Sequence, residues 1–452
     1  MSEKKLPEVV TRRHFLAGSA TTAAAALVAA GVEAAPAKPA AKPAAAKPSP
    51  AKPAAKSEVA KTEPAKPTTP PPAPVNVAVI GLGPHGRETL ASLSRAPGAN
   101  IVAVCDKYEP FHKRGLEVAP KAAALSDYRQ VLERADVQAV FIATPTHQHK
   151  EIALAAIQAG KHVYLEAPMA HTMEDGRAIA RAAQGSKGVF QVGQQNRGNP
   201  QHHHVNHFIH GAVLGKVTYG RGQWHKRDTM YRGAPSDERM REINWRLDPA
   251  LSLGLIGEYG IHSLDVSNWF QNSLPVAVTG FSAMLGDWEK QRSVSDTVQC
   301  VLEYPIGVRY SFDATHTNSY EGQFDLFGGS DAAVLLRDQR AWLFKEADAP
   351  LLGWEVYARK DEWGDETGIA LVADASKQIK EGKIPGKEKQ TQDPGKTALY
   401  FAAESFLNCI RENKKPDCGP VQGYQALVTA LKANEAAVKG TRIVYQQEWF
   451  SL

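Results

Sequence analysis

The chain has 452 residues and a formal net charge of +5, a length that allows two domains with cores of their own. Residues 1–74 hold nine Lys, two Arg and five Glu, a net charge of +6, which leaves −1 for residues 75–452. Nucleic-acid binding depends on clustered Lys and Arg, so the folded part does not indicate a nucleic-acid partner. The four cysteines lack CxxC spacing and are expected as free thiols, with a pairing of Cys409 and Cys418 left open.

Residues 1–34 are typical of an export signal. The pair Arg12-Arg13 precedes an Ala-rich, mildly apolar stretch, and Val32–Ala34 offers a small-residue cleavage site. This pattern predicts a twin-arginine signal and a periplasmic protein. A cytosolic tail or a membrane anchor is the alternative, but the short, alanine-dominated run is a poor permanent membrane span.

Residues 35–74 repeat Ala-Lys-Pro units and end in a run of prolines. They contain no aromatic residue and almost no large apolar one, so they cannot bury a core. We expect a disordered, semi-extended linker of polyproline character.

The folded part opens with an apolar, β-branched run from Val75 that ends in a glycine-rich turn. A helix-like pattern follows, so the pattern predicts a strand, a tight turn and a helix N-terminus that binds the phosphates of a dinucleotide. The first glycine allows the turn, the second lets a pyrophosphate approach, and the third lets helix and strand pack closely. The candidate cofactor-binding residues of this turn are Gly81, Leu82, Gly83, Pro84, His85 and Gly86.

A second apolar run, Ile101–Cys105, ends in Asp106, twenty residues after Gly86. A carboxylate at this place can accept hydrogen bonds from an adenosine ribose and repels a 2′-phosphate, so NAD is favoured over NADP. Lys107 leaves NADP open. The alternative for the whole motif is a plain βα turn.

Strand-like and helical patterns then alternate up to residue 196, which predicts a doubly wound parallel sheet, a Rossmann domain over residues 75–196. Ligands of such sheets bind beyond the carboxyl ends of the strands. From residue 197 to 452, long alternating runs predict an α+β domain with a largely antiparallel open sheet, closed by two amphipathic helices near 397–411 and 424–439.

Together these pieces resemble the Gfo/Idh/MocA oxidoreductase superfamily from Val75 to the C-terminus. The matching stretches are the glycine turn with Asp106, ATPTHQH (143–149), AGKHVYLEAP (159–168) and GEYGIHSLDVSNW (257–269). The resemblance implies an NAD(P)-binding domain, a sheet domain used for oligomer contacts, and a site between them where sugars or polyols meet the nicotinamide. It also implies that the cofactor is bordered by Thr144, Pro145, His149, Glu166, Ala167 and Gln194.

The chain departs from this family at the Glu-Lys-Pro motif, which here is Glu166-Ala167-Pro168. In the sugar dehydrogenases that lysine contacts the hydroxyl being oxidised and helps to move its proton, and alanine can do neither. The chain is therefore expected to be an inactive relic or to take its proton acceptor from elsewhere, and Pro168 is expected to follow a cis or otherwise constrained bond.

The resemblance offers a proton acceptor in the family's Asp-x-x-x-His pair, which here is Glu258 and His262. Residues four apart share one helix face, and an imidazole near a carboxylate suits abstraction of a hydroxyl proton. Asp265 follows at i+3 and is expected to orient His262. The alternative is that His262 and Asp265 only cap or pack a helix.

The spacing Tyr259-x-x-His262 is similar to an NAD-dependent glycoside hydrolase branch of the same superfamily, which also lacks the lysine. That branch implies redox-neutral chemistry in which a sugar carbon is oxidised, the leaving group is eliminated, water adds and the hydride returns. Tyr259, His262 and Glu258 are the candidate catalytic residues for either reaction. This chain matches that branch's motif only in part.

Further polar and aromatic residues fall in the family's substrate loops or at the end of a strand over the cofactor. The candidate substrate residues are Asn196, Arg197, Trp224, Arg246 and Asp265. The spacing of His203 and His207 can chelate zinc, but there is no HExxH pattern and no nearby Cys, so no metal site is expected.

Export constrains the reaction, because the periplasm offers no obvious pool of NAD or machinery to recycle it. A protein exported folded can carry its cofactor and then needs chemistry that restores it. The sequence therefore predicts an oxidoreductase that acts on a sugar-like hydroxyl through a tightly held nicotinamide. The alternatives are a redox-neutral NAD-dependent glycosidase and a non-catalytic sugar-binding relic of the fold.

Overall fold

The computed structural model of the chain describes residues 72–286, 292–363, 365–373 and 396–452. The expected export signal and nearly all of the expected linker lie outside these ranges. None of the helices within them is both long enough and apolar enough to cross a membrane. All four cysteines are free thiols.

The first sheet has six strands in the order β3-β2-β1-β4-β5-β6, and every neighbouring pair is parallel. This order is that of a dinucleotide-binding Rossmann fold, which confirms the predicted doubly wound sheet. The strands are β1 (Val75–Ile80), β2 (Ala99–Cys105), β3 (Ala123–Leu125), β4 (Ala139–Ile142), β5 (His162–Glu166) and β6 (Phe190–Gly193). The helices of this part are α2 (Pro84–Leu93), α3 (Pro110–Val118), α4 (Tyr128–Glu133), α5 (His149–Gln158) and α6 (Met173–Gln184).

Two hydrophobic cores form on opposite faces of this sheet, because β1 and β4 are buried on both sides. One face is covered by α2, α3 and the late helix α11 (Ala398–Glu412), and the other by α4, α5, α6 and α12 (Pro420–Lys439). Phe406 of α11 packs edge to face on Phe141, with ring centroids 5.2 Å apart. The last helices of the chain therefore complete the core of the first domain.

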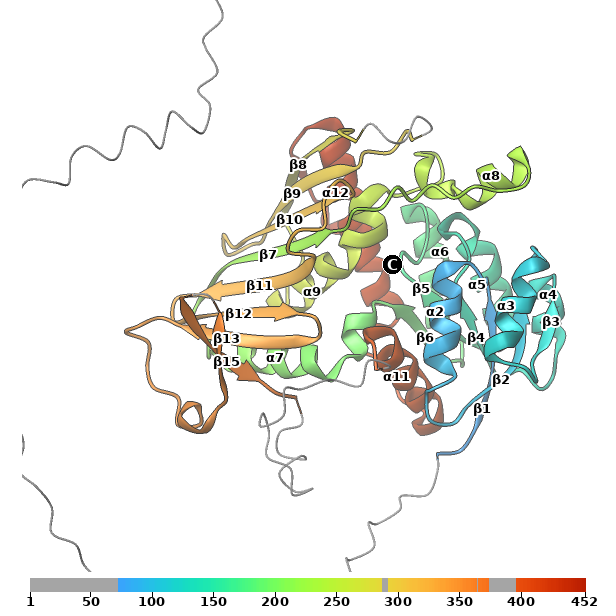
Figure 1. Cartoon of the computed structure of the whole chain (residues 1–452), viewed down its shortest axis with the longest axis horizontal. Helices are drawn as coiled ribbons and strands as arrows, with labels where there is room; N and C mark the ends of the chain where they lie inside the picture. Colours follow the sequence, from blue (N-terminus) through green and yellow to red (C-terminus); the bar gives the residue numbers. More distant parts are fainter. Residues whose placement is uncertain (1–71, 287–291, 364, 374–395) are drawn as a thin grey trace, which may run out of the picture. The chain divides into compact units, whose positions relative to one another are not determined.

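The second sheet has ten strands in the order β14-β15-β13-β12-β11-β7-β10-β9-β8-β16, antiparallel except for the pair β7 and β10. This confirms the largely antiparallel sheet (Figure 1). The strands are β7 (Val217–His225), β8 (Ala277–Ala283), β9 (Thr297–Glu303), β10 (Arg309–Thr315), β11 (Gln323–Gly329), β12 (Ala332–Arg337), β13 (Arg340–Lys345), β14 (Lys360–Trp363), β15 (Glu366–Leu371) and β16 (Ile443–Val444).

Three helices share a core with one face of this sheet, namely α7 (Pro200–His210), α9 (Ile261–Gln271) and α12. The side chains of Ala426 and Ala430 on α12 join this core, while Leu427 and Val428 join the core of the first sheet. One helix thus packs on both sheets.

The chain makes a long excursion between β7 and α9 that carries the short helix α8 (Asp237–Ile243). Figure 1 shows α8 away from the ten-stranded sheet, on the side of the six-stranded one. Ser236 is the N-cap of this helix, since its side chain accepts a hydrogen bond from the backbone N–H of Arg239. We call residues 226–247 the α8 arm.

Candidate functional site

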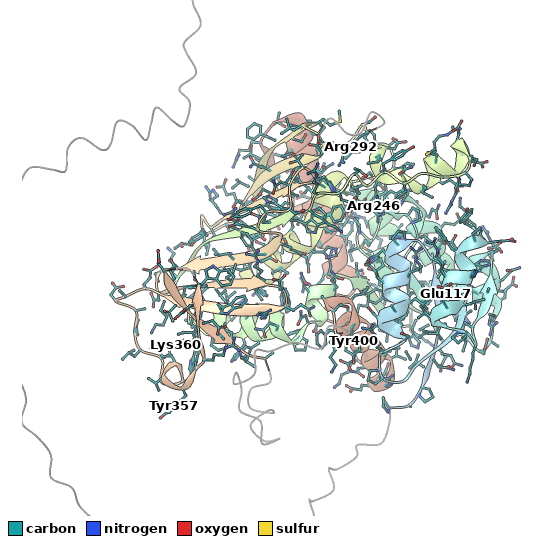
Figure 2. The ribbon with its side chains drawn as sticks, in the orientation of Figure 1. Glu117, Arg246, Arg292, Tyr357, Lys360 and Tyr400 are labelled. Carbon is teal, nitrogen blue, oxygen red and sulfur yellow. The ribbon has the colours of Figure 1, made fainter. Side chains whose placement is uncertain are left out.

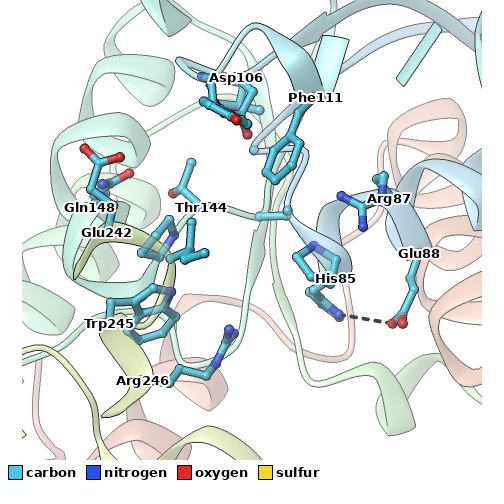
Figure 3. A pocket seen from close by; sticks show the side chains of 18 of the residues that line it. His85, Arg87, Glu88, Asp106, Phe111, Thr144, Gln148, Glu242, Trp245 and Arg246 are labelled. Carbon is cyan, nitrogen blue, oxygen red and sulfur yellow. Dashed lines mark hydrogen bonds and ion pairs between the residues drawn. The ribbon is translucent and has the colours of Figure 1, made fainter. Parts of the chain in front are cut away.

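A cavity of about 1960 Å³ lies beyond the carboxyl ends of the parallel strands, between them, the α8 arm and the segment that leads into α9. Pockets for one drug-sized ligand measure roughly 300–1000 Å³, so this cavity has room for a dinucleotide and a second molecule. Arg246 lies between the two sheets (Figure 2), and Figure 3 shows it pointing with His85 into this space.

The glycine turn is built as the sequence predicts. Gly81 has φ +96°, and a Cβ on it would lie 2.7 Å from the carbonyl carbon of Ala143. A Cβ on Gly86 would lie 1.9 Å from the Gly81 carbonyl oxygen, so helix and turn touch there. Gly83 lines the cavity, and a Cβ on it would meet nothing within 4 Å. This open cradle at a helix N-terminus fits the pyrophosphate of a dinucleotide.

Asp106 connects this turn to the loop after β2. Its Oδ2 accepts the backbone N–H of Leu82 at 2.7 Å, and its Oδ1 accepts that of Tyr108 at 2.8 Å. The carboxylate lines the cavity, and each oxygen keeps a second lone pair for a ribose hydroxyl. The side chain of Leu82 is fully buried, so only its backbone belongs to the site.

The other predicted cofactor residues divide into two groups. Thr144, Pro145 and Ala167 line the cavity, and the buried Thr144 hydroxyl has no partner in the described structure. His149 is buried behind it, with its ring nitrogens 2.9 Å from the carbonyl oxygens of Thr144 and Pro168, and burial lowers its pKa to about 4. The bond between Ala167 and Pro168 is cis, as expected.

Gln194, at the end of β6, is 2% exposed and does not line the cavity, and neither atom of its amide has a partner in the described structure. Its neighbour Gln195 lines the cavity instead. The Rossmann turn after β6 therefore presents the following residue, a one-position difference that the sequence pattern does not resolve.

Glu166 is 5% exposed and is not itself a lining residue. Its Oε1 accepts the Thr89 hydroxyl at 3.2 Å, and its Oε2 forms an ion pair with Nε2 of His85 at 3.1 Å. Burial lowers the pKa of His85, but the charge and hydrogen bond of Glu166, helped by Glu88, outweigh this and raise that pKa to about 10. His85 is therefore an imidazolium at neutral pH.

The three predicted catalytic residues all line the cavity, but Glu258 and His262 do not pair as predicted. Glu258 lies in a π-helical turn, Ile256–Gly260, whose i→i+5 pattern shifts it from the α-helical register that the i,i+4 prediction assumed. Its Oε1 accepts the backbone N–H of Leu253 at 3.4 Å, and its Oε2 pairs with Arg246 Nε at 3.2 Å. Burial nevertheless raises the pKa of Glu258.

His262 is a neutral imidazole. Burial lowers its pKa to about 4, against the charge of Glu166, which raises it. Its Nδ1 is buried without a partner in the described structure, and the ring lines the cavity. Because the ring makes no hydrogen bond there, it is free to accept a proton from a ligand.

The proposed orienting role of Asp265 is not what the structure shows. Its two oxygens accept hydrogen bonds from Arg197, Nε to Oδ2 at 2.8 Å and Nη2 to Oδ1 at 2.9 Å. Asp265, Arg197 and Asn196 are all buried outside the cavity lining, so none is placed to touch a substrate. A bidentate pair of this kind holds α9 to the turn after β6.

Trp224 and Arg246, the other predicted substrate residues, do line the cavity. The indole of Trp224 stacks on Tyr259, with centroids 4.0 Å apart and an interplanar angle of 22°. His316 is fully buried edge-on to both rings, at 5.3 and 5.7 Å. This packing fixes the Tyr259 ring at the cavity that His262 also lines.

Of the α8 arm, only the end around Arg246 was expected at the site, and the helix α8 itself was not. Arg239 lies over the ring of Tyr108 at 4.1 Å, and Glu242 pairs with Lys107 at 2.5 Å. On the other side Trp245 packs edge-on against His147, centroids 5.8 Å apart. The arm thus bridges the loops after β2 and β4, at the end of the cavity that holds Asp106. The only sequence signal was a helix-start pattern, Ser-Asp-Glu, which carries no information about tertiary contacts.

The histidine-rich helix α7 shows no metal centre within the described ranges, where no group of three metal-ligating side chains occurs. Nε2 of His203 lies 2.6 Å from the Arg197 carbonyl oxygen, and burial lowers the pKa of His202 to about 3.

The fold and the cavity define a two-domain protein with a dinucleotide site between a Rossmann sheet and an antiparallel sheet. A family model described as "Oxidoreductase family, NAD-binding Rossmann fold" matches residues 75–194, and "GFO/IDH/MocA C-terminal domain" matches residues 202–333. The chain belongs to the Gfo/Idh/MocA oxidoreductase family.

Individual relatives match only part of the chain. A 4-carboxy-2-hydroxymuconate-6-semialdehyde dehydrogenase of Sphingobium is 34% identical over 31% of this chain and 44% of its own length. A glycosyl hydrolase family 109 protein of Porphyromonas gingivalis is 34% identical over 24% of this chain and 25% of its own. The chain thus spans less than half of either relative.

Among solved structures, levoglucosan dehydrogenase in complex with NADH superposes with a TM-score of 0.68 at 19% identity, covering 82% of this chain and 99% of that one. At this identity the likeness establishes a shared fold.

Proposed function

We propose that the protein is an NAD-dependent oxidoreductase that acts on a hydroxyl of a sugar or sugar-like molecule, with a nicotinamide that stays bound between turnovers. One observation carries this most: the open glycine cradle shares a cavity with a neutral imidazole and a tyrosine. A sugar dehydrogenase among the structural neighbours is consistent with such a substrate.

Bound NAD would supply the hydride acceptor, and the chain supplies the rest. His262 is the base that takes the hydroxyl proton, since it is neutral and has no competing hydrogen bond in the described structure. The ring of Tyr259, fixed by Trp224, presents its hydroxyl to the substrate. NAD is favoured over NADP because Asp106 faces the ribose position and Lys107 is engaged by Glu242.

A redox-neutral glycosidase is the second candidate. Ala167 stands where the dehydrogenases carry a lysine, Tyr259 and His262 both line the cavity, and one relative is a glycosyl hydrolase family 109 protein. The same residues would then handle the C–H proton and the leaving oxygen. A third possibility, a sugar-binding relic, requires that the cavity holds a sugar without turnover.

We propose further that the protein is exported folded to the periplasm. Arg12-Arg13 and the Ala-rich stretch that follows support this. The α8 arm, which bridges the loops at the Asp106 end of the cavity, would help to keep the cofactor bound during export. Fractionation of cells, with Arg12→Lys plus Arg13→Lys as the control that blocks the route, tests it.

The function is tested in two steps. The protein is purified without added cofactor and denatured, and mass spectrometry of the released small molecules should find NAD. If no nucleotide is released and none binds when added, the relic is favoured. Incubation with p-nitrophenyl glycosides and free sugars then separates the enzymes. Release of p-nitrophenol without a net rise at 340 nm identifies the glycosidase, and stoichiometric NADH identifies the dehydrogenase.

A further inference from the structure

The family lysine is replaced by Ala167, but a cation pairs with the preceding residue, Glu166. Ala167 follows Glu166, whose Oε2 holds Nε2 of His85 at 3.1 Å. His85 comes from the glycine turn, far away in sequence, and its side chain is 41% exposed where it lines the cavity. The structure therefore places a positively charged side chain, from a different segment of the chain, next to this glutamate.

The second ring nitrogen of His85 makes no hydrogen bond in the described structure. Its Nδ1 lies 3.7 Å from Glu88 Oε2, an ion pair that is too long for a hydrogen bond (Figure 3). An imidazolium has two N–H donors, and Glu166 takes only one of them. The second N–H faces only the exposed carboxylate of Glu88, and a ligand oxygen in the cavity can take the place of that loose ion pair.

His85 also lies near the base. Its charge lowers the pKa of His262, while the charge of Glu166 raises it, so the three groups influence one another electrostatically. The other charged groups that act on His85 are Glu88 and Arg246, and Arg246 is itself paired with Glu258. Among these groups, only His85 combines a positive charge with a ring that can point a second N–H at a reacting oxygen.

We propose that His85, held by Glu166, takes the place of the missing lysine and donates a hydrogen bond to the substrate oxygen as that oxygen loses its proton. This rests on the proposed function. The hydroxyl proton would go to His262, the C–H bond would break with its two electrons leaving as hydride for bound NAD, and a C=O double bond would form. His85 keeps its own proton and stabilises the developing negative charge on the oxygen.

The protonation state is tested first, by NMR titration of the ring signals of the full chain. His85 should stay protonated well above pH 7 in the wild type and in Glu88→Gln, the matched control. In Glu166→Gln its pKa should fall towards 6.5. A wild-type His85 that titrates near 6.5 overturns the proposal without any activity measurement.

Binding and turnover follow. His85→Ala and His85→Gln are first titrated with NAD, followed by fluorescence, so that turnover can be compared at saturating NAD. Their kcat with NAD bound should fall by roughly 10²–10³, as for loss of one oxyanion donor. The double change His85→Ala with Ala167→Lys should recover part of that loss.

The outcomes separate the two proposals. A wild type that binds no NAD defeats the proposed function whatever the state of His85. A wild type that binds and turns over, beside a His85→Ala variant with the same kcat, defeats only the role of His85.

Discussion

At the scale of single residues, His262 depends on burial for its chemistry. An exposed histidine is partly protonated near pH 6.5, whereas burial lowers the pKa of His262 to about 4 and keeps the ring neutral. The free base is therefore present over the whole physiological range.

His262→Ala should lower kcat by about 10²–10⁴ without loss of NAD binding, since it removes a general base and leaves the cradle intact. In the wild type the rate should hold down to about pH 5 and drop as pH falls through 4, because protonation removes the base. His210→Ala is the control, because the ring of His210, at the end of α7, contacts the carbonyl oxygen of Phe270 on α9. Full turnover by His262→Ala would remove it from the mechanism.

Substitution of two glycines of the same turn is expected to have opposite effects on stability and on NAD binding. Gly86→Ala puts a methyl group 1.9 Å from a carbonyl oxygen, so it should lower Tm by several degrees, in line with about 1–3 kcal/mol for overpacking. Gly83→Ala has open space and should keep Tm, yet it should weaken NAD binding at least tenfold because its methyl group fills the cradle. Thermal melts and NAD titrations of both variants check this. Equal NAD affinity in Gly83→Ala and wild type would contradict the cradle.

At the scale of elements, the α8 arm is expected to govern how fast the cofactor leaves. Arg239→Ala removes the contact with Tyr108, a cation–π interaction of about 0.5–2 kcal/mol, so release of NAD should be roughly 3- to 30-fold faster. Stopped-flow displacement of bound NAD by a fluorescent analogue measures it. Arg241→Ala, on the same helix and exposed, loses equal charge without that contact. If both variants release NAD at the same rate, the arm does not control cofactor release.

The helices and strands also show how much of the structure could be predicted from the sequence. Most strands and helices up to residue 196 were predictable because their runs are apolar and punctuated, and the glycine turn was predictable because backbone geometry demands those residues. The three-residue β3 and the helix α3, which buries only Gly115, were not predicted because neither forms a clear apolar pattern. The pairing of Glu258 with His262 failed because a π-turn cannot be told from an α-helix by spacing. The pair His85–Glu166 could not be foreseen, since its members are 81 positions apart and meet only when the start of α2 packs against the end of β5.

Within the whole molecule, the outer face of the ten-stranded sheet is expected to carry a second copy of the chain. Tyr219, Phe281 and Val301 point outward from it and are 48%, 66% and 37% exposed. Exposed apolar groups gathered on one face indicate an interaction surface. Phe281→Asp with Val301→Asp should convert an oligomer to a monomer in light scattering, with Val438→Asp, exposed on α12, as control. A monomeric wild type would contradict the assembly.

Asp106 has a consequence for protein engineering. Both of its oxygens already bind backbone N–H groups in the glycine turn and the next loop, so its side chain is positioned before any ribose arrives. The common route to an NADP-using variant removes this negative charge, but here the same change would also cut the tie between two cofactor loops. Asparagine could replace only one of the two acceptors. Redesign of cofactor choice in this protein therefore has to begin by supplying a new brace for the turn.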